Sequence, residues 1–248
     1  MIIREEFETR VAEVIKYFDF LQKIDTEDYR LLNNYSQQPV FIIDDDLHKI
    51  LKANGFVILY NLIESTIYNS VVAIFDELNV DNLDYHKCTE SIKRFWLRHV
   101  YKYDELIVNE NLIYNKCYNI VQKIFDDVAL NITENLKYGG SLDGKMIRKL
   151  ALELGVILSE EHYKKDLHGI ALLNIKSNRN DLAHGKKSFS DIAKDITYNG
   201  LITYNAEGDE QIQSLGLKHY KNFTIEHLDK YISSVEIFIG DKSYKLAQ

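Results

Sequence analysis

The segment IKSNRNDLAHGKKSF, residues 175–189, gathers an arginine, a histidine and several amides just before a glycine. A histidine with a pKa near its ordinary value of about 6.5 can transfer a proton at neutral pH. An arginine presents a planar fork of donors that fits a phosphodiester. Arg179 and His184 are therefore suited to RNA cleavage, in which the 2′-hydroxyl is the internal nucleophile and no metal is required.

Other polar residues of this segment could support the same chemistry. Asn180 could hold the phosphate or orient His184, and Ser188 could donate a further hydrogen bond. Three lysines would supply a local positive field that the chain as a whole lacks: Lys176, Lys186 and Lys187.

The same segment also fits a plain helix end. Arginine, lysine and histidine near a helix C-terminus complement the helix dipole, and Gly185 suits the left-handed position that follows a helix. Five residues turn an ideal helix by about 140°, so Arg179 and His184 would not converge on one point from a straight helix. Convergence requires a helix break near Gly185 or a second chain.

An apolar stripe becomes polar within the same expected helix. Leu167, Ile170 and Ala171 begin a helical face that continues onto Asn174 and Asn178. A buried amide without partners costs about 1–3 kcal/mol, so we expect these asparagines to hydrogen-bond across a helix interface or to face a hydrated cleft. Either arrangement predicts a polar pocket.

A second helix is expected to supply groups to this pocket. Residues 56–78 are apolar almost all round, which is typical of the central helix of a bundle, although their β-branched residues are also compatible with a strand. A carboxylate on this segment could pair with Arg179 or orient His184, or it could belong to a structural polar network. The candidates fall within about 100° of one another on a helical wheel: Tyr60, Asn61, Glu64 and Tyr68.

The rest of the chain predicts a mainly α-helical protein, because proline occurs once and most glycines fall between periodic segments. An acidic run at residues 44–46 favours the start of a long helix, and residues 197–222 are expected to form a polar loop or small hairpin. We expect an N-terminal helical extension over residues 1–43 and a helical domain over residues 44–248. A helix is predicted from residue 166 into the motif, one over residues 144–154 that ends at Gly155, and one over residues 225–239 that Thr224 caps. Helical periodicity predicts three more, over residues 2–23, 90–103 and 109–136.

Composition narrows the class of protein further. The net charge of −8 argues against a protein that coats nucleic acid through bulk electrostatics. Cys88 and Cys117 lack metal-ligand spacing, and the histidines lack it too, so we expect reduced thiols and neither a metal nor another cofactor. The start of the chain is soon acidic and no uninterrupted apolar run reaches the roughly 18 residues of a membrane span, which indicates a cytoplasmic protein.

At RNDLAHG the sequence resembles the HEPN superfamily, whose pattern is R-x4-6-H with a polar residue after the arginine. Arg179, Asn180 and His184 match these three positions. The wider segments NLDYHKCTESIKRFW, GGSLDGKMIRKLALELG and NRNDLAHGKKSF resemble the MAE-type prokaryotic HEPN nucleases in particular. The resemblance covers roughly residues 50–240.

The resemblance implies a bundle of four or more helices that forms a homodimer, with two motifs facing one cleft and a metal-independent RNA endonuclease activity. It implies a toxin or antiviral defence effector, with an antitoxin or second defence protein as a further partner. His184 would be the general acid and base, Arg179 the phosphate stabiliser and Asn180 an orienting residue. Some superfamily toxins carry a tyrosine two residues after the histidine that an antitoxin modifies with nucleotides, but Lys186 occupies that position here.

Two alternatives remain open at this level. Some members of the superfamily bind RNA, a nucleotide or a partner protein without cleaving, so a catalytically silent HEPN module is the first. The second is a structural helical protein in which Arg179 and His184 are solvated residues of a helix end.

Overall fold

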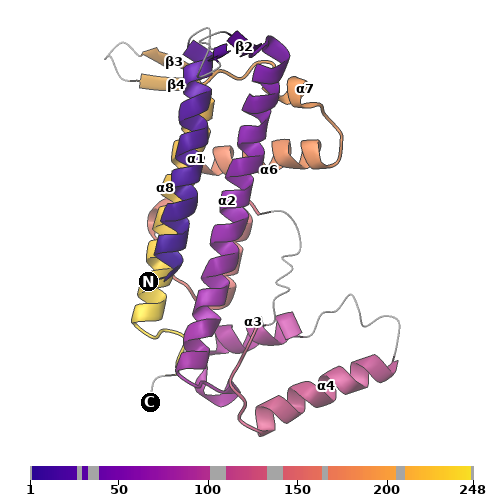
Figure 1. Cartoon of the computed structure of the whole chain (residues 1–248). Coiled ribbons are helices and arrows are strands. Elements are labelled where there is room, and N and C mark those ends of the chain that lie inside the picture. The colour runs from indigo at the N-terminus through magenta and orange to yellow at the C-terminus, as the bar shows by residue number, and fades with distance from the viewer. Residues whose placement is uncertain are drawn as a thin grey trace. The chain divides into compact units, whose positions relative to one another are not determined.

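The structure is a computed structural model of the chain (Figure 1). It describes residues 2–26, 30–32, 39–100, 110–132, 142–163, 167–204 and 210–246. The fold is mainly α-helical, as predicted. The helices are α1 (Ile2–Thr26), α2 (Asp45–Val80), α3 (Glu90–Val100), α4 (Glu110–Phe125), α5 (Gly144–Leu154), α6 (Leu167–Ala183), α7 (Phe189–Ala193) and α8 (Leu217–Gly240).

Two antiparallel hairpins and two 3-10 turns complete the described elements. The hairpin of β3 (Leu201–Tyr204) and β4 (Glu210–Ser214) confirms the small hairpin predicted within residues 197–222. The hairpin of β1 (Arg30–Leu32) and β2 (Pro39–Ile42) was not predicted, and it shows that residues 1–43 are not entirely helical. The 3-10 turns are η1 (Tyr85–Lys87) and η3 (Glu160–Tyr163).

The chain divides into two compact units, and α2 and α8 contribute to both. The motif unit comprises residues 2–65 and 164–228, and the α3–α5 unit comprises residues 66–163 and 229–248. The predicted division into domains 1–43 and 44–248 stays a prediction.

In the motif unit, α1 and the first part of α2 run antiparallel. The Tyr17 hydroxyl on α1 donates a hydrogen bond to the Leu51 carbonyl on α2 at 2.6 Å, while Asp25, later on α1, lies 3.4 Å from the earlier His48. Helices α6 and α8 are also antiparallel, because His168 near the start of α6 contacts Glu226 on α8 at 3.1 Å, while Asn174 further along α6 meets the earlier Tyr220. Helix α6 carries Arg179 and ends at the motif.

In the α3–α5 unit, apolar faces of α3 and α5 pack together. The largest buried side chain of α3 is Trp96, whose indole N–H donates to the Asn131 carbonyl at 3.0 Å. Helix α5 starts after Asp143, whose carboxylate accepts the Met146 N–H, and it ends at Gly155 in the left-handed conformation. These boundaries confirm the predicted helix over residues 144–154.

Two helix boundaries correct the sequence predictions. Helix α8 begins at Leu217, not at residue 225, because Leu217 and Tyr220 are buried and extend the apolar face of the helix back before Thr224. Thr224 is itself buried inside this helix and does not cap it. Helix α4 ends at Phe125, well before residue 136, because Asp127 adopts a positive φ of 51°. Residues 101–103 and 133–136 of the predicted helices lie outside the described residues.

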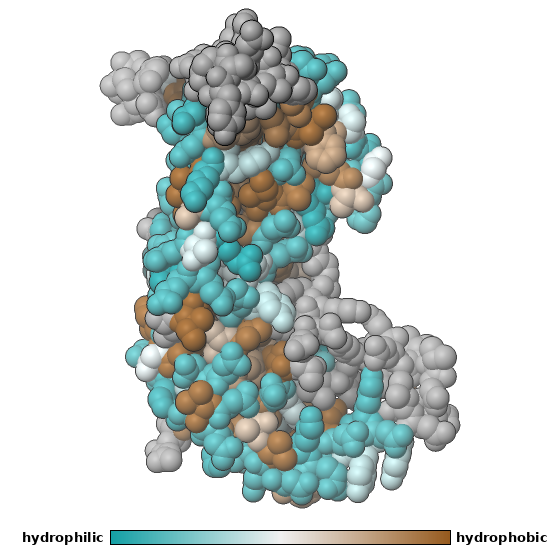
Figure 2. Space-filling view, in the orientation of Figure 1, coloured by the Kyte–Doolittle hydropathy of each residue, from teal (hydrophilic) through white to brown (hydrophobic). Residues whose placement is uncertain are grey.

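Among the described helices, α2 is the one long and apolar enough to cross a membrane by length and composition. Its most apolar 18-residue window has a mean hydropathy of 1.4, and half of that window is buried within the structure. A core helix passes the same test, so this is weak evidence for a membrane span. In the view of Figure 2, hydrophilic residues cover most of the described surface and hydrophobic residues form separate patches.

Candidate functional site

Helix α6 ends in a Schellman motif that the predicted glycine completes. The Gly185 N–H donates to the Leu182 carbonyl at 3.1 Å, and the Lys186 N–H donates to the Asp181 carbonyl at 2.8 Å. Gly185 has a φ of +63°, the left-handed conformation that this motif requires at the first residue after the cap. The local sequence therefore fixes the end of the helix just after His184.

The two principal motif residues do not converge within one chain. The His184 N–H donates to the Asn180 carbonyl at 3.0 Å, so helical hydrogen bonding continues up to His184. Five residues of helix separate the directions of Arg179 and His184 by about 140°. The break at Gly185 comes after His184 and does not redirect it, so His184 is exposed while Arg179 faces α2.

Arg179 meets the α2 residues that the helical wheel singled out. Its guanidinium carbon lies 4.3 Å from the centre of the Tyr60 ring, and its Nη2 lies 3.6 Å from Oε2 of Glu64. Its Nη1 donates a hydrogen bond to Oδ1 of Asn180 at 3.1 Å. The side chain of Arg179 keeps 30% of its surface exposed, whereas Tyr60 is fully buried. A cation is thus fixed over an aromatic face at the edge of the solvent.

The α2 face that contacts Arg179 also packs against α8. Phe56, Tyr60 and Glu64 follow one another at intervals of four residues and so share one face of α2. The Phe56 ring meets the Tyr220 ring edge to face at 5.1 Å, and the Tyr220 hydroxyl accepts a hydrogen bond from Asn174 at 3.2 Å. Burial raises the pKa of Tyr220, and the bond from Asn174 opposes this only in part. Asn174 therefore hydrogen-bonds across a helix interface, one of the two arrangements that the sequence predicted.

Two of the predicted supporting residues have partners close in sequence. The Ser188 hydroxyl donates to Asp191 at 2.6 Å and accepts the Asp191 N–H at 3.1 Å, so it caps α7. Lys187 pairs with Asp181 at 3.1 Å. Of the remaining predicted residues, Lys176 and Asn178 are half-buried, and Asn61 and Lys186 are exposed.

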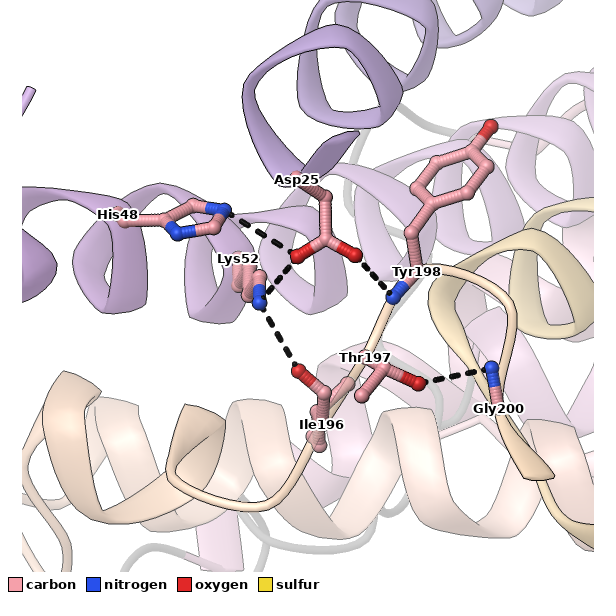
Figure 3. A network of polar contacts seen from close by, with 7 residues as sticks. All are labelled: Asp25, His48, Lys52, Ile196, Thr197, Tyr198 and Gly200. Carbon is pink, nitrogen blue, oxygen red and sulfur yellow. Dashed lines mark hydrogen bonds and ion pairs between the residues drawn. The ribbon is translucent and has the colours of Figure 1, made fainter. Parts of the chain in front are cut away.

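A polar network ties the segment after α7 to α1 and α2 (Figure 3). Asp25, at the end of α1, contacts the Lys52 ammonium at 2.6 Å and accepts the Tyr198 N–H at 3.0 Å. Lys52 also donates to the Ile196 carbonyl at 3.2 Å, and His48 lies 3.4 Å from Asp25. No local sequence pattern predicts this network, because its members lie far apart along the chain.

The charges of this network follow from burial and from Lys52. Burial raises the pKa of the Asp25 carboxyl, but the hydrogen bonds from Lys52 and Tyr198 together bring that pKa below its ordinary value. Burial lowers the pKa of His48, the charge of Lys52 lowers it further, and Asp25 opposes these effects incompletely. At neutral pH these shifts favour an ionised Asp25 carboxyl and a neutral His48 imidazole.

In the part of the chain that the structure describes, no group of three or more His, Cys, Asp or Glu side chains could hold a metal ion. Cys88 is buried, and burial raises its pKa to about 11. It is therefore a thiol at neutral pH. Cys117 is exposed.

A mainly helical domain with an R-x4-H motif at the end of a helix has the features expected of a HEPN-type protein. A family model for MAE_28990-like HEPN domains matches residues 2–244, so the chain belongs to this HEPN family. The match covers nearly the whole chain and includes α1, which lies outside the 50–240 region of resemblance. No curated protein and no solved structure gave a significant match.

Proposed function

We propose that this protein is a metal-independent RNA endonuclease of HEPN type. The observation that carries the proposal is the position of Arg179, which a buried aromatic ring and a carboxylate hold in place while 30% of its side chain remains exposed. A guanidinium fixed in this way can accept a phosphodiester with little loss of side-chain freedom.

In this proposal, His184 moves the protons and Arg179 stabilises the phosphate. His184 takes the proton from the 2′-hydroxyl as its oxygen attacks phosphorus, and a protonated imidazole then gives a proton to the departing 5′-oxygen as the P–O5′ bond breaks. The products are a 2′,3′-cyclic phosphate and a 5′-hydroxyl. Asn180 orients Arg179, because its side-chain oxygen accepts the Arg179 hydrogen bond.

A second copy of the chain completes the site in this proposal. Within one chain, the helix directs Arg179 and His184 about 140° apart, which prevents them from meeting at one phosphate. A symmetric dimer that sets two α6 ends against each other would place His184 of one copy near Arg179 of the other. The resemblance to HEPN nucleases favours the same arrangement.

The proposed biological role is that of a cytoplasmic toxin or antiviral defence effector, with an antitoxin or second defence protein as partner. Lys186 stands where some superfamily toxins carry a modifiable tyrosine. Neutralisation by nucleotide transfer to that position is therefore not part of the proposal.

The test is cleavage of end-labelled RNA by the purified full chain in EDTA. Arg179→Ala and His184→Ala are each expected to lower the cleavage rate by about a hundredfold or more, the scale of general acid–base and electrostatic stabilisation. Matched controls are Arg10→Ala on α1 and His86→Ala in η1, both exposed, which should cut like wild type. Equal cleavage by the His184 variant would overturn the proposal, and cleavage that EDTA abolishes would indicate a metal enzyme.

The second candidate is a catalytically silent HEPN module that binds RNA, a nucleotide or a partner protein. The observation that favours it is that Asn180, Glu64 and Tyr60 already contact Arg179, while His184 faces elsewhere in the same chain. Measurable RNA or nucleotide affinity without any turnover would support this candidate. Absence of both would leave a structural role.

A further inference from the structure

Positive charge gathers on α3 and α5, which belong to a different unit from the motif. These two helices carry six lysine or arginine residues and two glutamates, a surplus of four positive charges, although the whole chain has a net charge of −8. None of the other helices that the structure describes has a surplus above one positive charge. Helices α3 and α5 together therefore carry a charge opposite in sign to that of the whole chain.

A furrow of about 290 Å³ lies between α3 and α5. Arg94 and Arg98, one helical turn apart on α3, line it together with Ser91 and the carboxylates of Glu90 and Glu153. Phe95, which is almost fully buried, and Leu152, which is 74% exposed, give it an apolar side. Its volume is at the lower end of the range of small-ligand sites, which suits a nucleotide-sized group better than an element of a folded protein.

Two arginines and two glutamates line the furrow, and Lys149 on α5, which is not part of the lining, adds a third cation beside it. Arg94 contacts Glu90 at 2.7 Å, and Arg98 contacts Glu153 at 2.5 Å. Lys149 shares Glu153 from 3.9 Å. The three cations are 75%, 63% and 62% exposed, and ion pairs this exposed contribute little to stability. They can therefore exchange a carboxylate for a phosphate.

We propose that the α3–α5 furrow binds the phosphodiester backbone of single-stranded RNA. Arginine forks match phosphate oxygens, and the exposed Leu152 side chain offers an apolar surface for a sugar or a base face. Contacts of this kind hold a strand without reading its sequence. The inference rests on the proposed function in taking RNA as the substrate, but it concerns a surface outside the catalytic motif.

The experiment measures binding of a fluorescein-labelled single-stranded RNA of about 20 nucleotides by anisotropy in EDTA. The full chain carries His184→Ala so that the RNA is not cut. The test variant adds Arg94→Glu and Lys149→Glu, and the matched control adds Arg10→Glu and Lys16→Glu on α1, which changes the net charge equally on two exposed residues. We expect the test variant to bind at least about tenfold more weakly and the control to stay within about twofold.

The salt dependence provides a second readout. Each lost phosphate contact lowers the slope of log affinity against log salt by about 0.7 for a single strand, so two lost contacts should lower it by roughly 1.4. If the test variant and the control bind RNA equally well, the proposal is wrong. Should the charge reversals impair folding, judged by thermal melting, Arg94→Gln with Lys149→Gln takes their place, and unchanged affinity there also rejects the proposal.

A competition experiment distinguishes RNA from other polyanions as the ligand of the furrow. An RNA cleavage assay distinguishes this proposal from the endonuclease proposal. A polyglutamate peptide that displaces the labelled RNA as well as unlabelled RNA does would assign the furrow to acidic peptides and overturn the assignment to RNA. Wild-type protein that binds RNA through the furrow but never cuts it would contradict the endonuclease proposal and support this one.

Discussion

The guanidinium carbon of Arg179 lies 4.3 Å from the centre of the Tyr60 ring. Stacking of this kind orients a guanidinium without using its N–H donors, which remain available to Asn180, to Glu64 or to a phosphate. Tyr60 is fully buried, so its ring is a fixed platform, whereas Glu64 keeps 45% of its side chain exposed and pairs at 3.6 Å. The ring therefore constrains Arg179 more tightly than the carboxylate does.

The first prediction concerns this platform. Tyr60→Leu removes the ring, so Arg179 becomes mobile and RNA cleavage should fall by about ten- to a hundredfold, the range expected for lost positioning. Tyr60→Phe keeps the ring and should retain most of the activity. Cleavage rates are compared after circular dichroism has shown that both variants are folded. An equal loss in the Phe variant would assign the effect to the hydroxyl.

The second prediction tests whether two chains share one site. Arg179→Ala and His184→Ala are each expected to be inactive alone, because each removes one of the two groups from every site. If the two groups act across a symmetric dimer, a mixed dimer has one site with both groups intact. Refolding the two variants together at equal amounts should then restore roughly a quarter of wild-type cleavage. No recovery, despite mixed dimers seen in a tagged pull-down, would mean that the site is not shared in this way.

The third prediction concerns the end of α6. Gly185→Ala should lower the free energy of unfolding by about 1 kcal/mol, because an alanine is strained at a φ of +63° although its Cβ would meet nothing within 4 Å. The matched control is Gly169→Ala, a helical position in α6 with equally open space. That change should stabilise the helix by about 0.5–1 kcal/mol. Urea unfolding measures both, and opposite signs are the expected result.

The fourth prediction concerns the pH dependence of Asp25. Its pKa in the folded protein is lower than in the unfolded chain, so its stabilisation is present above the unfolded pKa of about 3.9 and is lost as the pH falls through the folded pKa. At pH 7, Asp25→Asn should lower the free energy of unfolding by about 1–3 kcal/mol, because Lys52 and the Tyr198 N–H lose a charged acceptor.

The difference between wild type and Asp25→Asn should therefore shrink when the pH falls below about 4. Urea titrations at pH 7 and at low pH measure this difference, with the exposed Asp19→Asn on α1 as control. A difference that stays constant over this range would show that the charge of Asp25 does not contribute to folding.

The sequence predicted a helix end correctly where a capping side chain or a glycine in the left-handed conformation lies within a few residues of that end. The end of α5 at Gly155 and the end of α6 before Gly185 are of this kind. The start of α8 was predicted wrongly, because Thr224 resembles a cap in sequence while the burial of Leu217 and Tyr220 extends the helix. The β1–β2 hairpin was also missed, since its short strands carry no strong periodic pattern.

The sequence by itself determined the helical class, the resemblance to HEPN proteins and the motif with its terminating glycine, because these depend on residue type and short spacing. It also placed Tyr60 and Glu64 on one helical face, but it left their partner open. Only the tertiary structure decided that Arg179 lies over Tyr60 and that Asp25 joins Lys52 to Tyr198. Contacts between residues so far apart in the chain depend on how helices pack, and helical periodicity sets which face is buried without specifying what covers it.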